Sequence, residues 1–392
     1  MISVKEAKEK IEEKVALLQP KVLALKDVAG LTLAADVYAK FDIPAFAQSS
    51  MDGYAFNFRD KDVALSIQNK IAAGDSKSYA ISDEQGARIF TGAPLPANAD
   101  TVVMQEKVTV ENGNILINDD GLQKGDYVRS KGGEIKSGEI ALPVNTSLTS
   151  GAIGFLAAIG IAEVSVYPPP LVTVVITGNE LQQPGRELLF GQVYEANSFA
   201  LSAALRQSGI ENIELLYAED KPDVVQETLE KALANSDLVL LTGGISVGDY
   251  DYVLQATEKC GVEKHFHKIR QKPGKPLYFG TKERKVVFGL PGNPGSVLSC
   301  FYEYVLPAIE KMMAKTNSVK KIKATLQNGY SKNAGMTHFL KGLYEDGKVK
   351  ILSSQASFQL RSFAVANCLI VIDEGTETVK EGHEVEVDLF PV

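Results

Sequence analysis

The chain has 392 residues, of which 45% are hydrophobic and 23% charged, a composition typical of a soluble globular protein with two to four domains. Lys and Arg total 41 against 49 Asp and Glu, and the net charge of −8 argues against nucleic-acid binding along the whole chain. Three scattered cysteines, Cys260, Cys300 and Cys368, form no metal-binding or disulfide pattern.

The N-terminal segment predicts a packing or dimerisation helix from Ser3 to Leu18. Ser3 and Glu6 form the pattern of a capping box, and an apolar face repeats at helical spacing. This charged start does not resemble a signal peptide, and the longest apolar stretch, near Gly151 to Ala162, is too short and glycine-rich to span a membrane. We therefore expect a cytoplasmic protein without a membrane segment.

The next segment, Ile43 to Lys131, has short alternating runs that are broken by Gly, Pro and Asn. The residues ENGN from Glu111 separate two such runs, which is typical of a hairpin turn. We predict a small, mostly β domain here. Helical spacing returns from Gly138 to Ile161, with Thr149 and Ser150 as candidate caps.

A stiff run, Tyr167 to Pro170, marks a domain boundary, after which apolar strands alternate with amphipathic helices. This alternation predicts a largely parallel sheet that is covered on both faces. We expect the strands at 171–176, 213–218, 237–241 and 286–290, and the helices at 197–208, 223–234, 252–260 and 295–313. From about residue 317 onward, short strands predict a small barrel.

Three loops follow strands of this sheet, where ligands bind in open parallel sheets: VITGNE, LLTGGISVGDYD and FGLPGNPGS. Their glycines allow the backbone amides to approach an anion, and the separate segment KPGKP holds Lys272 and Lys275 between prolines. Glu180 and Asp251 are candidate Mg²⁺ ligands, because Mg²⁺ takes carboxylates together with phosphate oxygens. The pattern favours an enzyme that acts on a phosphorylated small molecule.

Simpler interpretations of these residues remain open at this point. The glycines fit ordinary tight turns, and Asp249 or Asp251 fits the N-cap of the next helix. Asp52 precedes a glycine and fits an ordinary turn, and Thr91 in TGAP fits an ordinary loop. His265 and His267 share one face of a predicted strand and fit packing better than catalysis. No Walker A lysine motif and no GxGxxG appears.

Seven motifs occur in the order found in the molybdopterin molybdenumtransferase family, which includes the E domain of gephyrin. They are SSMDGYA, FTGAPLP, VVMQE, TGNELQ, TGGISVGDYDY, KPGKP and FGLPGNP. The resemblance extends from the N-terminal helix to NCLIVI near Cys368. It implies a multidomain α/β fold with a helical and extended dimerisation domain (1–42 and 133–168), an inserted β domain (43–132), a three-layer molybdopterin-binding α/β domain with a parallel-rich sheet (169–316) and a C-terminal β-barrel (317–392).

The resemblance also implies a reaction: Mg²⁺-dependent insertion of molybdate into adenylylated molybdopterin, with release of AMP. The implied catalytic residues are Asp52, Thr91, Glu180, Asp251, Lys272 and Lys275, with Glu180, Asp251 and Asp52 at the metal. The implied substrate contacts are Gly243, Gly244, Ser246, Gly248, Asp249, Pro291, Gly292, Asn293, Pro294 and Ser357. The implied partners are a second copy that completes the site, a molybdopterin adenylyltransferase and molybdoenzyme apoproteins. The resemblance implies neither nucleic-acid nor membrane binding.

The sequence departs from the family pattern at four positions. Gly133 and Asn179 each replace a carboxylate, Gly295 replaces a β-branched residue in GNPVS, and Phe358 replaces a histidine after Ser357. Two other functions compete with insertion: adenylyl transfer to molybdopterin, which uses a related TGGISVGDYD motif, and a non-catalytic scaffold. SSMDGYA, the extra domains and the lysine pair favour insertion. Molybdate and tungstate have the same charge and similar size, so the sequence does not separate them.

Overall fold

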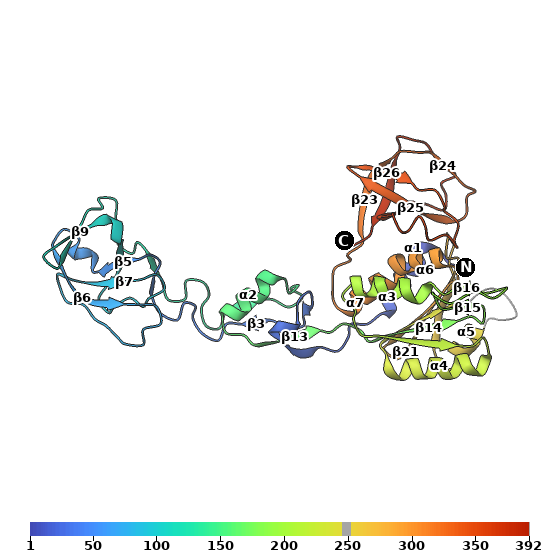
Figure 1. Ribbon diagram of the computed structural model, residues 1–392, viewed down its shortest axis with the longest axis horizontal. Helices are drawn as coiled ribbons and strands as arrows, with labels where there is room; N and C mark the ends of the chain where they lie inside the picture. Colours follow the sequence, from blue (N-terminus) through green and yellow to red (C-terminus); the bar gives the residue numbers. More distant parts are fainter. Residues whose placement is uncertain (245–251, 392) are drawn as a thin grey trace. The chain divides into compact units, whose positions relative to one another are not determined.

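The computed structural model describes residues 1–244 and 252–391, which form two compact units (Figure 1). The larger unit contains Met1–Val22, Gly30–Ala34 and Ser165–Val392, and the smaller unit contains Leu23–Ala29 and Ala35–Val164. This division is coarser than the four domains that the resemblance implies, and their boundaries stay a prediction.

A six-stranded sheet lies at the centre of the larger unit, in the order β17-β14-β18-β22-β21-β19. The first four strands are parallel, and β21 and β19 run antiparallel to their neighbours. Their bounds are β14 (Val172–Thr177), β17 (Ile213–Ala218), β18 (Leu238–Thr242), β19 (Glu263–Lys268), β21 (Pro276–Lys282) and β22 (Lys285–Leu290). Every residue of β14 and β18 is buried, as expected for parallel strands between two helical layers.

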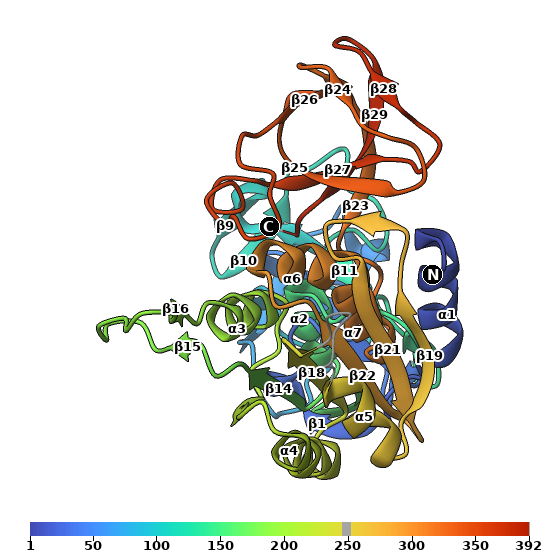
Figure 2. The same cartoon turned by 90° about the vertical axis from the view of Figure 1, so that its right-hand side faces the viewer.

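Helices cover both faces of this sheet, as Figure 2 shows, which confirms the predicted alternation. The helices α4 and α5 pack on one face, and α3, α6 and α7 lie on the other. Their bounds are α3 (Asn197–Gln207), α4 (Pro222–Asn235), α5 (Tyr252–Lys259), α6 (Pro294–Cys300) and α7 (Leu306–Met312). Within the described ranges, no helix combines the length and the apolar character needed to cross a membrane.

A π-helical turn at Phe301–Val305 joins α6 to α7, so that 294–312 forms one continuous helical segment. The sequence predicts this segment as an ordinary long helix, because a single extra residue in a turn hardly changes the spacing of apolar residues. The π turn carries Glu303 and Tyr304, both of which are buried, and turns of this kind are frequent at functional regions of helices.

The N-terminal helix α1 (Val4–Lys14) has the predicted capping box. The Ser3 hydroxyl accepts from the Glu6 amide, and the Glu6 carboxylate accepts from the Ser3 amide at 2.7 Å. The helix ends earlier than predicted, because Val15 is extended and the Leu18 amide donates to the Met312 carbonyl at 2.8 Å.

The C-terminal region is a closed five-stranded barrel, as predicted. Its strands run in the order β25-β26-β23-β29-β27, and pairing of β27 with β25 closes it. Their bounds are β23 (Lys320–Leu326), β25 (Thr337–Glu345), β26 (Lys348–Ile351), β27 (Cys368–Ile372) and β29 (Glu384–Leu389). Cys368, Ile370, Val349 and Val387 point into an apolar core, and closure leaves no edge among these five strands.

The smaller unit contains a six-stranded sheet in the order β8-β5-β7-β6-β10-β9. The predicted hairpin is present between β9 and β10, where Asn112 and Gly113 both have positive φ. The strand bounds are β5 (Gly53–Phe56), β6 (Leu65–Ile71), β7 (Gln85–Ile89), β8 (Thr101–Met104), β9 (Val108–Glu111) and β10 (Asn114–Ile117).

Helix α2 (Ser150–Ala158) also lies in the smaller unit and begins at the predicted cap, where the Thr149 hydroxyl accepts from the Ala152 amide. The helical spacing predicted from Gly138 is wrong before residue 149, because Ile140 pairs with Tyr38 in a strand instead.

The shorter strands are β1 (Lys21–Ala24), β2 (Thr32–Leu33), β3 (Val37–Tyr38), β4 (Gln48–Ser49), β11 (Val128–Arg129), β12 (Ile140–Leu142), β13 (Glu163–Tyr167), β15 (Leu181–Gln182), β16 (Val193–Tyr194), β20 (Gln271–Lys272), β24 (Tyr330–Ser331) and β28 (Thr378–Val379). Among the described residues, 3₁₀ turns occupy Leu25–Asp27, Phe58–Asp60 and Gln105–Lys107.

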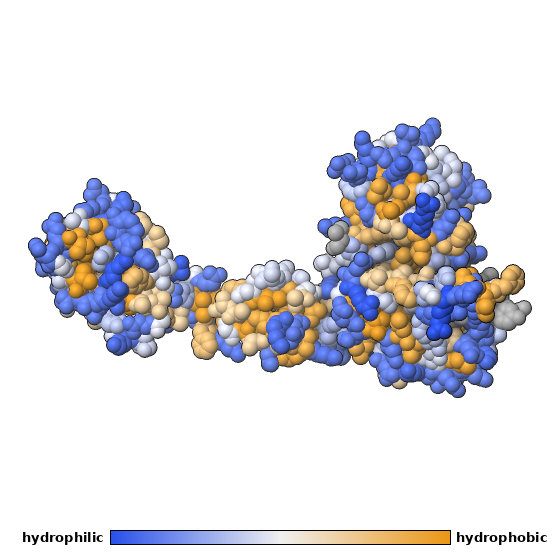
Figure 3. All heavy atoms as spheres, in the orientation of Figure 1, coloured by the Kyte–Doolittle hydropathy of each residue, from blue (hydrophilic) through white to orange (hydrophobic). Residues whose placement is uncertain are grey.

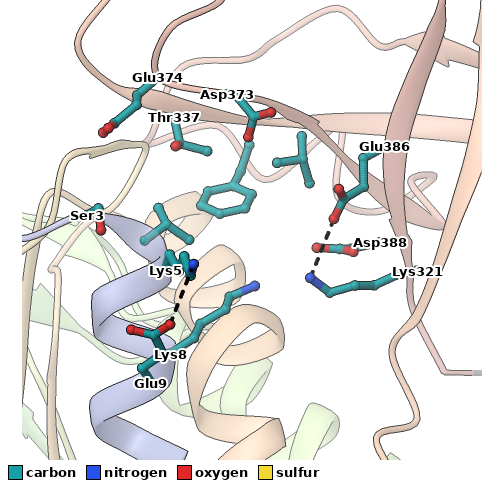
Figure 4. A pocket seen from close by; sticks show the side chains of 13 residues that line it. Ser3, Lys5, Lys8, Glu9, Lys321, Thr337, Asp373, Glu374, Glu386 and Asp388 are labelled. Atoms are coloured by element: carbon teal, nitrogen blue, oxygen red, sulfur yellow. Dashed lines mark hydrogen bonds and ion pairs between the residues drawn. The ribbon is translucent and has the colours of Figure 1, made fainter.

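Two buried carboxylates and a partly buried lysine join α1, the π turn and the barrel. The Lys8 ammonium donates to the Glu303 carboxylate at 2.5 Å, and Asp388 on β29 lies beside Glu303. Lys8 and Asp388 line a pocket of about 490 Å³ with Lys321 and Glu386, which form their own ion pair (Figure 4). One oxygen of each carboxyl group, Glu303 Oε1 and Asp388 Oδ1, is buried without another hydrogen-bond partner among the described residues. Two ionised carboxylates cannot hydrogen-bond each other. A proton kept on Asp388 lets this carboxyl group donate to Glu303, so that both groups are paired.

Burial, followed by the negative charge of Glu303, raises the pKa of Asp388 from 3.8 to about 7, although Lys8 and Lys321 act in the opposite direction. The folded protein thus holds this proton up to about pH 7, whereas an unfolded Asp releases it near pH 3.8. The stability that Asp388 contributes is therefore present at low pH and is lost as the pH rises through this window.

We expect Asp388→Asn to remove this part of the pH dependence, because Asn cannot ionise but can still donate to Glu303. Chemical unfolding of wild type and variant between about pH 4 and pH 8 tests it, with the exposed Asp373→Asn as the matched control. The stability of Asp388→Asn relative to wild type should rise with pH. An unchanged difference across the range would contradict the shared proton.

Candidate active site

Three glycine turns lie side by side at the carboxyl ends of β14, β18 and β22. Gly243 has a φ of 84°, and a Cβ at this position would lie 2.7 Å from the Thr177 carbonyl oxygen. A Cβ on Gly292 would lie 3.8 Å from the Cα of Gly243. The backbones of these loops therefore approach each other closely, as predicted for a ligand site at this edge of the sheet.

Two buried polar oxygens beside these turns have no hydrogen-bond partner within the described part of the chain. One is Thr242 Oγ1, at the end of β18, and the other is Asn197 Oδ1, at the start of α3. The amide of the same Asn197 side chain donates to the Gly292 carbonyl at 2.9 Å, which fixes its orientation. Because buried polar groups are rarely left unpaired, both oxygens are open to a hydrogen bond from a group outside the described residues.

Lys272 ends β20 and Lys275 directly precedes β21, so the two exposed lysines stand at the two ends of the connection 272–275, the lysine loop. Neither has an ion pair with any residue that the structure describes. Lys272 pairs in a parallel ladder with His338 of the barrel, and burial, followed by the positive charges of Lys332 and Lys272, lowers the pKa of His338 to about 4. His338 is therefore neutral at pH 7, and the ammonium groups of Lys272 and Lys275 give the lysine loop a positive charge that suits a small polyanion.

The turn that opens α6 is held against a loop of the barrel. The Asn293 amide donates to the Ser357 hydroxyl at 3.0 Å, so Ser357 keeps a polar contact with this turn although Phe358 follows it in place of a histidine. Lys341 is 2% exposed, and its ammonium donates to the carbonyl oxygens of Ser354, Ala356 and Gln359 at 2.7 to 3.3 Å. A buried lysine therefore fixes the loop that presents Ser357.

This close contact explains the glycine at position 295. A Cβ there would lie 2.8 Å from the Ser357 carbonyl oxygen and 3.2 Å from that of Gln359. The β-branched residue that the family pattern has at this position does not fit the loop as it lies here.

We expect Gly295→Ala to destabilise the larger unit by about 1 to 3 kcal/mol, the usual cost of overpacking a tight contact. Gly154→Ala in α2 is the matched control, because a Cβ on Gly154 meets nothing within 4 Å. Thermal unfolding of both variants tests the difference. Equal stability of the two would show that the barrel loop yields without cost.

Glu180 is exposed on the loop after β14, and its carbonyl accepts from the Val193 amide at 2.9 Å. The neighbouring Asn179 makes two hydrogen bonds with Asp220. The side-chain oxygen of Asn179 accepts from the Asp220 backbone amide at 3.2 Å, and the backbone amide of Asn179 donates to the Asp220 carboxylate at 3.4 Å. Asn179, a departure from the family pattern, thus has a structural role that needs no negative charge.

The fit to Mg²⁺ depends on the type of ligands present. Across residues 1–244 and 252–391, no three His, Cys, Asp or Glu side chains converge on a common point. Mg²⁺ commonly takes only one or two protein carboxylates and completes its shell with phosphate oxygens and waters. Glu180 fits such a metal, one that binds together with a phosphorylated ligand. Four predicted site residues, Ser246, Gly248, Asp249 and Asp251, lie outside the described residues.

In the smaller unit, the structure brings Asp52 and Thr91 together. The backbone amide and the hydroxyl of Thr91 both donate to Asp52 Oδ1 at 2.8 Å. These two hydrogen bonds, followed by the charge of Arg88, lower the pKa of Asp52, so this exposed side chain is anionic at neutral pH. Gly53 is required beside it, because a Cβ there would lie 1.8 Å from the Val103 carbonyl oxygen.

Sequence reasoning missed four residues that shape the site: Asn197, Gln271, Tyr304 and Lys341. Gln271 directly precedes KPGKP, so its position was the available signal. Lys341 lies within a strand whose pattern of polar and apolar residues gives no sign that a lysine is buried. Asn197 and Tyr304 become relevant only through contacts with residues that are distant in the sequence.

Comparisons with known proteins cover the whole chain. Residues 2–160 match the family described as MoeA N-terminal region (domain I and II). Residues 173–311 match the family described as Probable molybdopterin binding domain, and residues 323–390 match MoeA C-terminal region (domain IV). Together the three matches follow the predicted order of the helical and β region, the α/β domain and the barrel.

Individual relatives agree with this assignment. The chain is 36% identical to the molybdopterin molybdenumtransferase of a Nostoc species, over 93% of this chain and 87% of the relative. It is 32% identical to that of Haemophilus influenzae, over 100% and 99% of the two chains. A crystal structure of a molybdopterin biosynthesis moea protein from Pyrococcus horikosii has a TM-score of 0.87 at 30% identity, with both chains fully covered, which confirms the multidomain α/β fold. The chain belongs to the molybdopterin molybdenumtransferase family.

Proposed function

We propose that this chain inserts molybdate into adenylylated molybdopterin and releases AMP, as a step of molybdenum cofactor biosynthesis. Full-length relatives named molybdopterin molybdenumtransferase support the reaction class. The observation that carries the proposal is the pair of ammonium groups of Lys272 and Lys275, neither of which has an ion pair among the described residues. Their loop contacts α6, and the first turn of α6 directly follows the glycine turn at Gly292.

In this proposal the lysines bind the anionic groups, molybdate or the phosphates of the pterin. The Gly243 and Gly292 turns let the backbone approach the ligand, and Asn197 Oδ1 and Thr242 Oγ1 supply hydrogen-bonding oxygens. The lysines stabilise the negative charge that grows on the separating phosphates as the phosphoanhydride bond of the substrate breaks.

We further propose that the reaction depends on Mg²⁺, held by Glu180 and Asp251 of one copy together with Asp52 of a second copy. When bound, the ion would offset the charge of the pyrophosphate group. The lowered pKa of Asp52 supports a role as a fixed anion that accepts hydrogen bonds from a metal-bound water or an oxo group.

We also propose a homodimer in which both copies contribute to each site. The smaller unit exposes Tyr38, Phe41, Ile140 and Val144, of which Phe41 is 65% exposed. Figure 3 shows apolar atoms gathered on the segment that carries α2 and β3. Exposed apolar residues in such number favour a protein partner, and a second copy is the one that fits the predicted role of this segment. A cytoplasmic location, the adenylyltransferase as a partner and delivery to molybdoenzyme apoproteins complete the proposal.

The test is AMP release from adenylylated molybdopterin with Mg²⁺, with and without molybdate. We expect molybdate-dependent release by the wild type and a loss of about a hundredfold in Asp52→Asn, which keeps the shape of the side chain but removes its charge. Asp83→Asn is the matched control, because Asp83 is an exposed carboxylate in the same unit.

The other candidate functions give different results in the same assay. Formation of adenylylated molybdopterin from ATP, with no release of AMP from it, would replace the proposal by adenylyl transfer. Binding of neither compound would favour a scaffold.

A further inference from the structure

The loop that carries Lys272 and Lys275 is short and has few contacts of its own. Its two lysines are exposed, and the main-chain bonds at its base are from Ile269 N to the Lys275 carbonyl, at 3.0 Å, and from Gln271 N to the Ile269 carbonyl, at 2.9 Å. These bonds close the base of the loop but leave the carbonyls of Pro273 and Gly274, between the lysines, without a main-chain donor among the described residues.

The side chain of Gln271 supplies that donor. It is 1% exposed, and its Nε2 donates to the carbonyl oxygens of Pro273 and Gly274, each at 3.1 Å. A single carboxamide thus bridges the turn from inside and fixes the backbone on which both lysines stand. An amide that makes two such bonds must point its oxygen away from the loop, and that oxygen needs a donor of its own.

The donor is the hydroxyl of Tyr304, which bonds Gln271 Oε1 from the π turn. Tyr304 is 1% exposed, and burial, followed by the charge of Glu303, raises its pKa well above the ordinary value, so the hydroxyl stays protonated and can only donate here. This bond decides which way the Gln271 amide faces. The Lys8 ammonium lies 5.8 Å from the centre of the Tyr304 ring and helps to hold the ring in place.

The same helical segment also packs against the loop itself. Gly274 has a φ of 82°, and a Cβ there would lie 2.5 Å from Cys300 Sγ and 2.9 Å from Gln271 Nε2. Cys300 is fully buried, and burial strongly raises its pKa, so the thiol stays neutral, packs against the loop and donates a long hydrogen bond of 4.0 Å to the Gly274 carbonyl. Two neighbouring turns of one helical segment therefore contact the loop, one through Cys300 and one through Tyr304.

We propose that Gln271 and Tyr304 are positioning residues that hold Lys272 and Lys275 at a fixed separation for binding a diphosphate-type anion. The inference rests on the proposed function, since it assumes that the lysine pair binds the anionic substrate. A loop that is fixed before binding loses less conformational entropy when the anion arrives, which strengthens binding without adding a contact.

Binding of inorganic pyrophosphate to the full-length protein, measured by titration calorimetry, tests this positioning. We expect Tyr304→Phe to weaken binding about three- to tenfold, the range that one buried hydrogen bond produces. Gln271→Met should weaken it at least as much, and the double variant should be no weaker than Gln271→Met alone, because the two residues act through one bond. The control is Tyr278→Phe, since Tyr278 is equally buried but its hydroxyl lies beside Gly280 on β21.

A second readout separates positioning from general loss of stability. In a Lys275→Ala background, Tyr304→Phe should have a smaller effect on pyrophosphate affinity, whereas a merely destabilising change would have the same effect. Hydrogen exchange at the amides of Ile269 and Gln271, which close the base of the loop, should speed up in Tyr304→Phe, while protection in α4 stays as in the wild type.

The two proposals can fail separately. Lysine-dependent pyrophosphate binding that is equal in wild type and Tyr304→Phe would overturn the positioning role and leave the proposed function intact. If the wild type shows no lysine-dependent binding, the anion site of the proposed function is wrong. The exchange measurement then decides the rest: unchanged exchange at Ile269 and Gln271 in Tyr304→Phe would overturn the positioning role as well.

Discussion

The helical segment 294–312 is the constraint on which the rest of the larger unit depends. Most of its residues are buried, and its turns contact several different parts of the fold. Its first turn, at Gly295, meets the barrel loop. Cys300 and Tyr304 meet the lysine loop, directly or through Gln271, and Glu303 meets α1 and the barrel. Because one rigid element touches all these parts, their positions relative to the glycine turns are set together.

The π turn makes this possible. Glu303 and Tyr304 are consecutive, yet both are buried and serve different partners: Glu303 binds Lys8, and Tyr304 binds Gln271. The wider turn changes the direction of the side chains beyond it, which separates the contacts made before and after it. The charged contact between α1 and the barrel is therefore adjacent, along the same turn, to the contact that orients the lysine loop.

Much of the architecture could be predicted from the sequence because it depends on local patterns. The capping box at Ser3, the turn at Asn112 and Gly113, and the strands at 213–218 and 286–290 all have short-range signals, and the structure contains each of them. The strand at 140–142 was predicted wrongly as helix, because its partner at Val37–Tyr38 is distant in the sequence.

The candidate site divides in the same way. Motifs identified Asp52, Thr91, Glu180 and the lysine pair, but the roles of these residues stay predictions. The buried side chains that hold the site, such as Lys341 and Gln271, could not be predicted, since a lysine or glutamine in a strand usually lies at the surface. Their polar groups are stable inside the protein only because carbonyl oxygens converge on them, and that convergence is a property of the tertiary fold.

The most direct test of the account is the affinity of the protein for adenylylated molybdopterin when Lys272 and Lys275 are both replaced by Ala. The control replaces Lys259 and Lys264, two exposed lysines of the same unit, so that both variants lose the same charge. If the lysine pair binds the anionic groups of the substrate, the first variant binds about a hundredfold or more weaker, as expected for the loss of two charge-assisted contacts. The control then binds as tightly as the wild type. Equal affinity in the two variants would contradict the account.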